Sequence, residues 1–269
     1  MSEPAGPTET TYAEVVAQFA GRSPRASQRL ASWRADADKR DEVVPFVERM
    51  RTVSAYRLGP DDVAAVAEAT EHALGQAKRT IAESVIPVRD WHPSFAFEHV
   101  LHYTAESLGR VPTYGEFRIF CRDDPAAARM LLGPAQAIRE QAVAAGFEAE
   151  HVAQALRWRI GNAYYSYLKE IYALTVLRSA GIDARYHVLA DVLFRTDLWV
   201  GDLCLSMYVS NTFFKAGLSG RKPKAEEVLG DGPFRFAHLE IPAQPQFGTV
   251  HLPEPGQLVE IVLRQLDAP

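Results

Sequence analysis

Cysteine is scarce in this chain of 269 residues, which has only two, Cys121 and Cys204. Both have apolar neighbours, and no pair of Cys and His residues has the spacing of a zinc finger. Two cysteines cannot form a zinc site by themselves. The pattern therefore predicts two buried, reduced thiols in a reducing cytoplasm.

Long apolar segments are also missing. No run of about 18 apolar residues occurs, so no membrane span is expected. The N-terminal segment MSEPAGPTETT is polar and acidic and has no apolar core, which excludes a signal peptide. We expect a cytoplasmic protein without a membrane partner.

Positive charge is in the minority. The formal net charge is -5, so the chain does not coat nucleic acid through bulk electrostatics. Phosphates would have to be bound by a local basic patch or through cations. The chain also lacks a Walker-type loop, a dinucleotide fingerprint and a Gly-x-Ser-x-Gly elbow.

The order of patterns predicts two domains after a short tail. Residues 1–11 are rich in Pro, Thr and Glu, which is typical of a disordered tail. Residues 12–148 are rich in Ala and have helical spacing, including a long helix over 60–86. From 149 onward helices and strands mix, which indicates an α/β or α+β domain over 149–269.

This second domain should begin with a long helix over 149–180. On its helical wheel Glu170 lies at the edge of the apolar arc, and Lys169 points to solvent. Strands are expected over 186–194, 197–201 and 202–209, with a tight turn at 200–202. Further strands are expected over 234–241 and 248–252, followed by a helix over 256–266.

The strand-rich stretch 186–211 contains few titratable residues, and two of them are acids within apolar runs, Asp191 and Asp197. A carboxylate there is costly unless it is paired or bound to metal. If one strand ran unbroken through both, their even spacing would place them on one face. Carboxylate ligands suit Mg²⁺ (or Mn²⁺), which shares phosphate oxygens.

Glu170 on a helix, followed by Asp197 in a β-hairpin, resembles the PD-(D/E)xK, or restriction-endonuclease-like, nuclease superfamily. The resemblance covers about residues 164–224. It implies a restriction-endonuclease-like mixed sheet over 149–269, with Glu170 and Asp197 as catalytic metal ligands and Asp191 as a further ligand. The family carries Glu-x-Lys on the next strand, where this chain has Ser206-Met207-Tyr208.

Two explanations of this departure are open. The basic residue has migrated, and Lys215 or the Arg221–Lys222 pair reaches the site from the following segment. In that case Lys215 and Lys222 are catalytic, and the basic cluster Arg221, Lys222 and Lys224 grips nucleic acid. Alternatively, the site is inactive and the fold serves as a binding module.

Each acid also has a purely structural interpretation. Glu170 pairs with Arg178 or Arg185, Asp197 opens a strand or pairs with Arg195, and Asp191 caps a bend.

Three other patterns have structural alternatives of the same kind. The turn 109–116 is similar to that of bacterial helix-turn-helix modules, with Arg118 and Arg122 facing phosphates. Plain helical packing explains it better, because the following segment DDPAAARMLL is acidic at its start and rich in Ala. His99 and His102 are three residues apart on one helix. This spacing suits a pair of metal ligands, and it also suits two half-buried structural residues. Finally, Tyr164, Tyr165, Tyr167 and Tyr172 form a band suited to a core or to base stacking.

These observations, with the resemblance, predict a metal-dependent phosphodiesterase acting on nucleic acid, with DNA favoured over RNA. The resemblance alone implies a setting in bacterial defence or DNA processing. The alternative is a catalytically silent protein of the same fold that acts as a nucleic-acid-binding adaptor, as a partner of another protein or as a homodimer. A third possibility is a small-molecule-binding regulator whose pocket is lined by the tyrosines.

Overall fold

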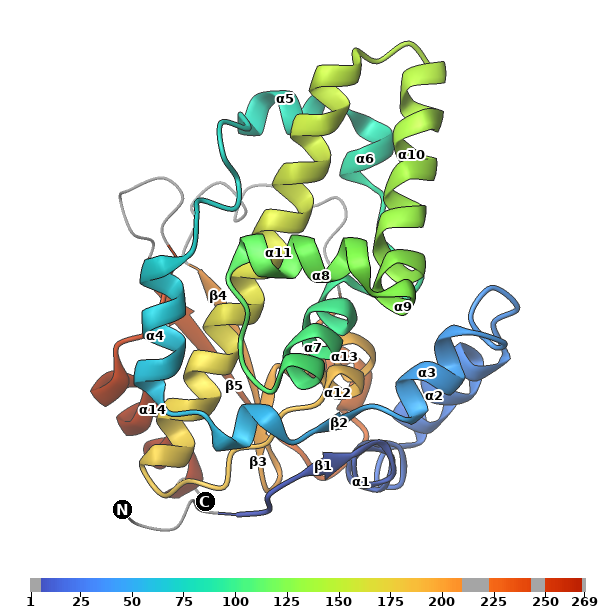
Figure 1. The fold of residues 1–269 in the computed structure, drawn as a ribbon. Coiled ribbons are helices and arrows are strands. Elements are labelled where there is room, and N and C mark those ends of the chain that lie inside the picture. Colours follow the sequence, from blue (N-terminus) through green and yellow to red (C-terminus); the bar gives the residue numbers. More distant parts are fainter. Residues whose placement is uncertain (1–5, 210–222, 243–249, 268–269) are drawn as a thin grey trace.

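The computed structural model describes residues 6–209, 223–242 and 250–267. Its described part belongs to the mixed α+β class: helices predominate, and two small sheets lie among them (Figure 1). The first sheet pairs β1 (Thr10–Thr11) with β2 (Arg51–Thr52), and the second contains β3 (Leu198–Val200), β4 (Leu203–Val209) and β5 (Arg235–Ile241).

Helical segments fill most of the chain before residue 149. They are α1 (Tyr12–Val15), η1 (Val16–Ala20), α2 (Pro24–Ala35), α3 (Val43–Glu48), η2 (Ser54–Arg57), α4 (Pro60–Ala69), α5 (Arg79–Ser84), α6 (Ile86–Arg89), α7 (Phe97–Leu108), α8 (Tyr114–Asp123), α9 (Pro125–Ala127), η3 (Ala128–Leu132) and α10 (Gly133–Ala144). The long helix expected over 60–86 was therefore wrong, because α4 ends at Ala69 and α5 begins only at Arg79.

Later in the chain, helix α11 (Ala149–Ser179) connects two parts of the molecule. Its N-terminal half lies away from the main sheet beside α5, α6 and α10, where small apolar residues such as Val85, Ala142 and Val152 form a separate cluster (Figure 1). Its C-terminal half packs against the sheet and is buried on nearly every side from Tyr167 to Arg178. A helix that is apolar on all sides is typical of a core position.

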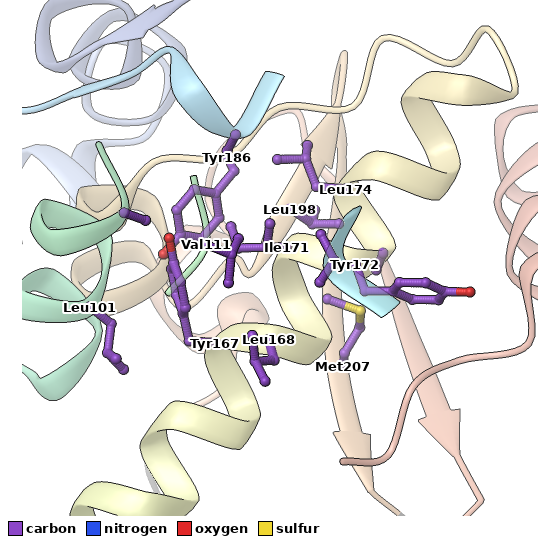
Figure 2. Close-up of a cluster of buried hydrophobic side chains, with 14 of the residues drawn as sticks. Leu101, Val111, Tyr167, Leu168, Ile171, Tyr172, Leu174, Tyr186, Leu198 and Met207 are labelled. Carbon is purple, nitrogen blue, oxygen red and sulfur yellow. The ribbon is translucent and has the colours of Figure 1, made fainter. Parts of the chain in front are cut away.

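The main sheet separates two hydrophobic clusters because side chains alternate along its strands. Leu198, Leu205 and Met207 face α11 and α14 (Pro255–Asp267). Figure 2 shows Met207 near Leu168 and Tyr172 of α11. On the other face, Trp199 and Cys204 pack against α12 (Val188–Phe194), η1, α2 and α13 (Ala225–Leu229).

Strand pairing agrees with the hairpin expected from the sequence. β3 is antiparallel to β4, and Gly201 in the turn has a φ of 55°, which suits glycine. β5 is parallel to β4, with Leu205 opposite Ala237. A parallel neighbour needs a crossover, and α13 lies within it.

The strand expected over 186–194 was wrong, because its residues form helix α12. The side chain of His187 caps this helix, since its Nδ1 accepts a hydrogen bond of 3.1 Å from the Leu189 amide. Val188 to Phe194 are mostly buried, and a short apolar run cannot be assigned to helix or strand from periodicity alone. Asp191 therefore lies on a helix and shares no strand face with Asp197.

Two further boundaries differ from the expectation. Thr10 and Thr11, which the sequence placed in the tail, pair with Thr52 and Arg51 in the first sheet. The expected strand over 248–252 lies partly outside the described residues, and its described part, 250–252, is not a strand.

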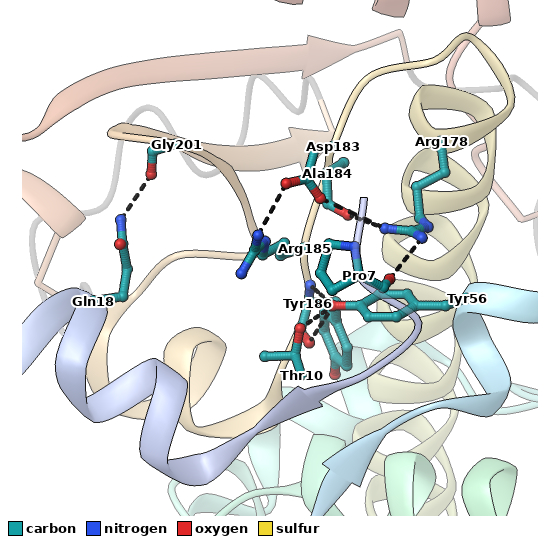
Figure 3. A network of polar contacts seen from close by, with 10 residues as sticks. All are labelled: Pro7, Thr10, Gln18, Tyr56, Arg178, Asp183, Ala184, Arg185, Tyr186 and Gly201. Carbon is teal, nitrogen blue, oxygen red and sulfur yellow. Dashed lines mark hydrogen bonds and ion pairs between the residues drawn. The ribbon is translucent and has the colours of Figure 1, made fainter. Parts of the chain in front are cut away.

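The N-terminal segment is attached to the C-terminal end of α11 (Figure 3). The guanidinium of Arg178 donates to the Pro7 carbonyl at 2.9 Å and to the Ala184 carbonyl at 3.1 Å, and it lies 4.1 Å from the centre of the Tyr56 ring. The Tyr56 hydroxyl also accepts a hydrogen bond of 3.0 Å from the Tyr186 amide. One hydrophobic cluster contains residues from both sides of position 148, such as Val100 and Leu174. The two expected domains therefore contribute to one hydrophobic core.

Candidate functional site

Glu170 lies where α11 meets the main sheet, as expected, and is only 4% exposed. Its Oε1 accepts a hydrogen bond of 2.9 Å from Ser166 Oγ, one helical turn earlier. Its Oε2 is buried and has no hydrogen-bond partner among the described residues. Burial, and next the negative charge of Asp197, raise the pKa of Glu170 to about 8.

Asp197 immediately precedes β3, and its carboxylate lies against β4. The Met207 amide donates to Asp197 Oδ2 at 2.6 Å, and the Asp197 amide donates to the Leu205 carbonyl at 3.0 Å. Among the charged groups, Asp197 has the largest effect on the pKa of Glu170, so the structure brings these two predicted acids together. Glu170 is buried and Asp197 is half-buried, and two negative charges in such a place are costly without a cation.

Lys169 is the third charged residue of this group, and its expected position on the solvent side of the helix was wrong. Lys169 does not point to solvent: it is 6% exposed, and its Nζ donates to the Met207 carbonyl at 3.2 Å and to Ser166 Oγ at 3.4 Å. Its positive charge lowers the pKa of Glu170, against the larger effects of burial and Asp197. Sequence reasoning missed Lys169 because the wheel gave α11 a solvent side, whereas the second half of the helix is covered all round.

Two further side chains lie near these charges. The carboxylate of Glu98, in the first turn of α7, adds to the raised pKa of Glu170. Burial lowers the pKa of His251, and the charge of Lys169 lowers it further. Neither residue has a motif that would have selected it from the sequence.

Asp191 lies in the first turn of α12 and is half-buried. Burial raises the pKa of Tyr186 well above its ordinary value, and the charges of Asp191 and Glu170 raise it further, so both acids face this tyrosine. Among residues 6–209, 223–242 and 250–267, no three His, Cys, Asp or Glu side chains are placed to hold one metal ion together. Asp191 is therefore not joined with Glu170 and Asp197 in one ligand set.

The positions of the expected Glu-x-Lys lie on the opposite face of β4 from Met207. Ser206 Oγ donates to the Arg195 carbonyl at 3.3 Å, and Tyr208 is 43% exposed. Neither residue brings charge to the pair of acids.

The expected basic residues are only partly described. Lys215, Arg221 and Lys222 lie outside the described residues. Lys224 is exposed and precedes the first residue of α13.

The expected arginine partner of Glu170 has other contacts. Arg178 binds Pro7, Ala184 and Tyr56, and Arg185 donates to Asp183 at 3.0 Å (Figure 3).

The remaining sequence patterns have structural roles. His99 and His102 are completely buried. Tyr164 and Tyr167 are buried in the core, in agreement with the core interpretation. The turn before α8 has the expected capping box, in which Thr113 Oγ1 accepts from the Glu116 amide at 3.3 Å. Both cysteines are buried, and burial raises the pKa of each thiol to about 12.

Comparison with known proteins adds no relative. No protein-family model, no curated protein and no solved structure matches this chain. No described helix combines the length and the apolar character that crossing a membrane requires.

Proposed function

We propose that the protein is a metal-dependent phosphodiesterase acting on nucleic acid, with Glu170 and Asp197 as the ligands of Mg²⁺ or Mn²⁺. The observation that carries this proposal is the pair formed by the buried Glu170 and the half-buried Asp197. Glu170 has one carboxylate oxygen without a hydrogen-bond partner among the described residues, and Asp197 is its strongest charged neighbour. Magnesium is commonly held by one or two carboxylates, its other positions being filled by water and substrate phosphate.

The donor set fits such an ion. Both groups are hard oxygen ligands, and Ser166 holds the Glu170 carboxylate through Oε1, which leaves Oε2 for a ligand. The Met207 amide fixes Asp197 in the same way through Oδ2. A bound Mg²⁺ would supply a Lewis acid and a water of lowered pKa. Asp191, on α12, would act from further out, through water or substrate.

The order of elements supports a nuclease-like architecture for 149–269. A helix with a buried acid, α11, is followed by the hairpin β3–β4 with the second acid, and then by β5. The migrated basic role remains with Lys215, Arg221 or Lys222, and Lys224 lies exposed at the start of α13 for phosphate contact.

The test uses purified protein with single- and double-stranded DNA and RNA, in Mg²⁺, in Mn²⁺ and in chelator. Asp197→Asn keeps an oxygen for the Met207 amide, and Glu170→Gln keeps the hydrogen bond from Ser166. We expect cleavage that requires metal and falls at least 100-fold in either variant, because each loses a charged ligand. Asp202→Asn, in the exposed turn of the same hairpin, is the matched control and should retain activity.

Absence of cleavage by the unaltered protein on every substrate contradicts this proposal. A second function, a catalytically silent adaptor of the same architecture, is then favoured by one observation. Ser206 and Tyr208 stand where the acid and the lysine of the motif are expected. In that case nucleic-acid or partner binding would be the same in Asp197→Asn as in the unaltered protein.

A further inference from the structure

Lys169 occupies an unusual position for an ammonium group. It is nearly completely buried, and its hydrogen bonds go to one backbone carbonyl and one hydroxyl, those of Met207 and Ser166. Burying a lysine without a carboxylate in reach is costly. The group therefore depends on the negative charges around it.

These hydrogen bonds connect Lys169 to both acids through shared partners. The amide and carbonyl of one residue in a β-strand point to the same edge, so the amide and carbonyl of Met207 lie side by side. Asp197 Oδ2 accepts from this amide at 2.6 Å, and Lys169 Nζ donates to this carbonyl at 3.2 Å. On the helix, Ser166 Oγ accepts from Lys169 Nζ and donates to Glu170 Oε1.

We propose that Lys169 is the built-in counter-ion of the Glu170–Asp197 pair and that it competes with a divalent cation for these carboxylates. Without metal, the ammonium balances the charge of Asp197 and, whenever Glu170 is ionised, part of the charge of both acids. With metal, the same ammonium repels the incoming ion and so sets the concentration at which the site fills. This inference rests on the proposed function, because it takes the two acids as the metal ligands.

If Lys169 competes with the metal, replacing it should change the metal affinity in the opposite direction from the replacement of a purely structural lysine. Removing the ammonium relieves a repulsion that is twice as large for a divalent ion as for a proton. Metal binding should therefore become tighter, even though a proton on Glu170 is also held more firmly. If Lys169 only supports the packing, its replacement should disturb the site and weaken metal binding.

The experiment measures the Mn²⁺ dissociation constant by electron paramagnetic resonance at pH 8, without nucleic acid. Lys169→Met keeps the length of the side chain without its charge, and Lys169→Gln keeps a hydrogen-bond donor if the methionine variant does not fold. We expect Mn²⁺ to bind at least about tenfold more tightly in either variant than in the unaltered protein. Lys169→Arg should remain within a few-fold, and Lys78→Met, at an exposed position, is the control for the lost surface charge.

Equal or weaker Mn²⁺ binding in Lys169→Met or Lys169→Gln overturns this inference. If the unaltered protein binds no Mn²⁺, binding gained by either variant supports it, and no binding in any variant overturns it. The outcome is separate from that of the proposed function, which depends on cleavage by the unaltered protein. A metal site can therefore exist and be controlled by Lys169 in a protein that cleaves nothing.

Discussion

At the scale of single residues, the described site consists of groups whose charges depend on one another. Glu170 has a raised pKa because it is buried and lies near the charge of Asp197. Lys169 shares Ser166 with Glu170 and Met207 with Asp197 as hydrogen-bond partners. The sequence indicated Asp197 from its apolar surroundings and Glu170 from its place at the edge of the apolar arc of its helix. It could not identify Lys169, because helical periodicity describes one helix and not the elements that later cover it.

Tyr56 offers a test of a single buried hydroxyl. Its Oη lies 2.5 Å from Thr10 Oγ1 and accepts the Tyr186 amide at 3.0 Å (Figure 3). Tyr56→Phe leaves that buried amide without a partner, so we expect the free energy of unfolding to fall by about 1–3 kcal/mol. Urea titration measures the loss. Tyr208→Phe, at an exposed position, should change stability by less than about 0.5 kcal/mol, and an equal effect of both variants would contradict the assignment.

At the scale of elements, several patterns in the second half of the chain were predicted well, whereas the long helix expected over 60–86 was wrong. The sequence indicated α11, the hairpin β3–β4, β5 and α14 from periodicity, turn residues and helix caps. It mistook α12 for a strand because a run of seven mostly buried residues has no polar side to reveal its period. In the structure His187 caps the start of this helix and Arg195 closes it with a φ of 60°, but neither residue type is a usual signal for a helix end in a sequence.

The cap of α12 also makes this helix sensitive to acid. Burial, and next the charge of the nearby His102, lower the pKa of His187 to about 3. The neutral ring accepts from the Leu189 amide through Nδ1 and donates through Nε2 to the Met50 carbonyl at 3.1 Å. A second ring proton would place a donor against the Leu189 amide. The unfolded chain binds this proton near pH 6.5 and the folded chain does not, so stability falls as the pH drops below that value.

We therefore expect His187 to lower the free energy of unfolding by about 1.4 kcal/mol for each unit by which the pH falls between pH 6 and 4. Glutamine does not titrate in this range, so the free energy of unfolding of His187→Gln should depend on pH less steeply than that of the unaltered protein, by about 1.4 kcal/mol per pH unit. Urea titrations of both proteins across this range measure the difference. Parallel pH dependences would show that the imidazole titrates equally in the folded and unfolded chains.

At the scale of the whole molecule, the candidate site lies where three parts of the chain meet. α11 supplies Glu170 and Lys169, the hairpin supplies Asp197, and α7 brings Glu98 near them. Residues on both sides of position 148 contribute to the main hydrophobic cluster, so the packing that buries these charges is spread over much of the described chain. Such long-range packing is why sequence patterns indicated the acids but not the buried Lys169 or the nearby Glu98.

A buried acid with an oxygen that lacks a hydrogen bond should reduce the stability of the metal-free protein, as is common at functional sites. At pH 7.5 the raised pKa keeps the Glu170 carboxyl mostly protonated, and Glu170→Gln removes the cost in stability of taking up this proton on folding while it keeps the hydrogen bond from Ser166. Without metal at pH 7.5, we expect it to raise the free energy of unfolding by about 1–3 kcal/mol. Thermal unfolding in chelator checks the gain, with Asp202→Asn as the exposed control. A loss of stability in Glu170→Gln would mean that the ionised carboxylate holds the fold together, and the structural interpretation of Glu170 would then be preferred.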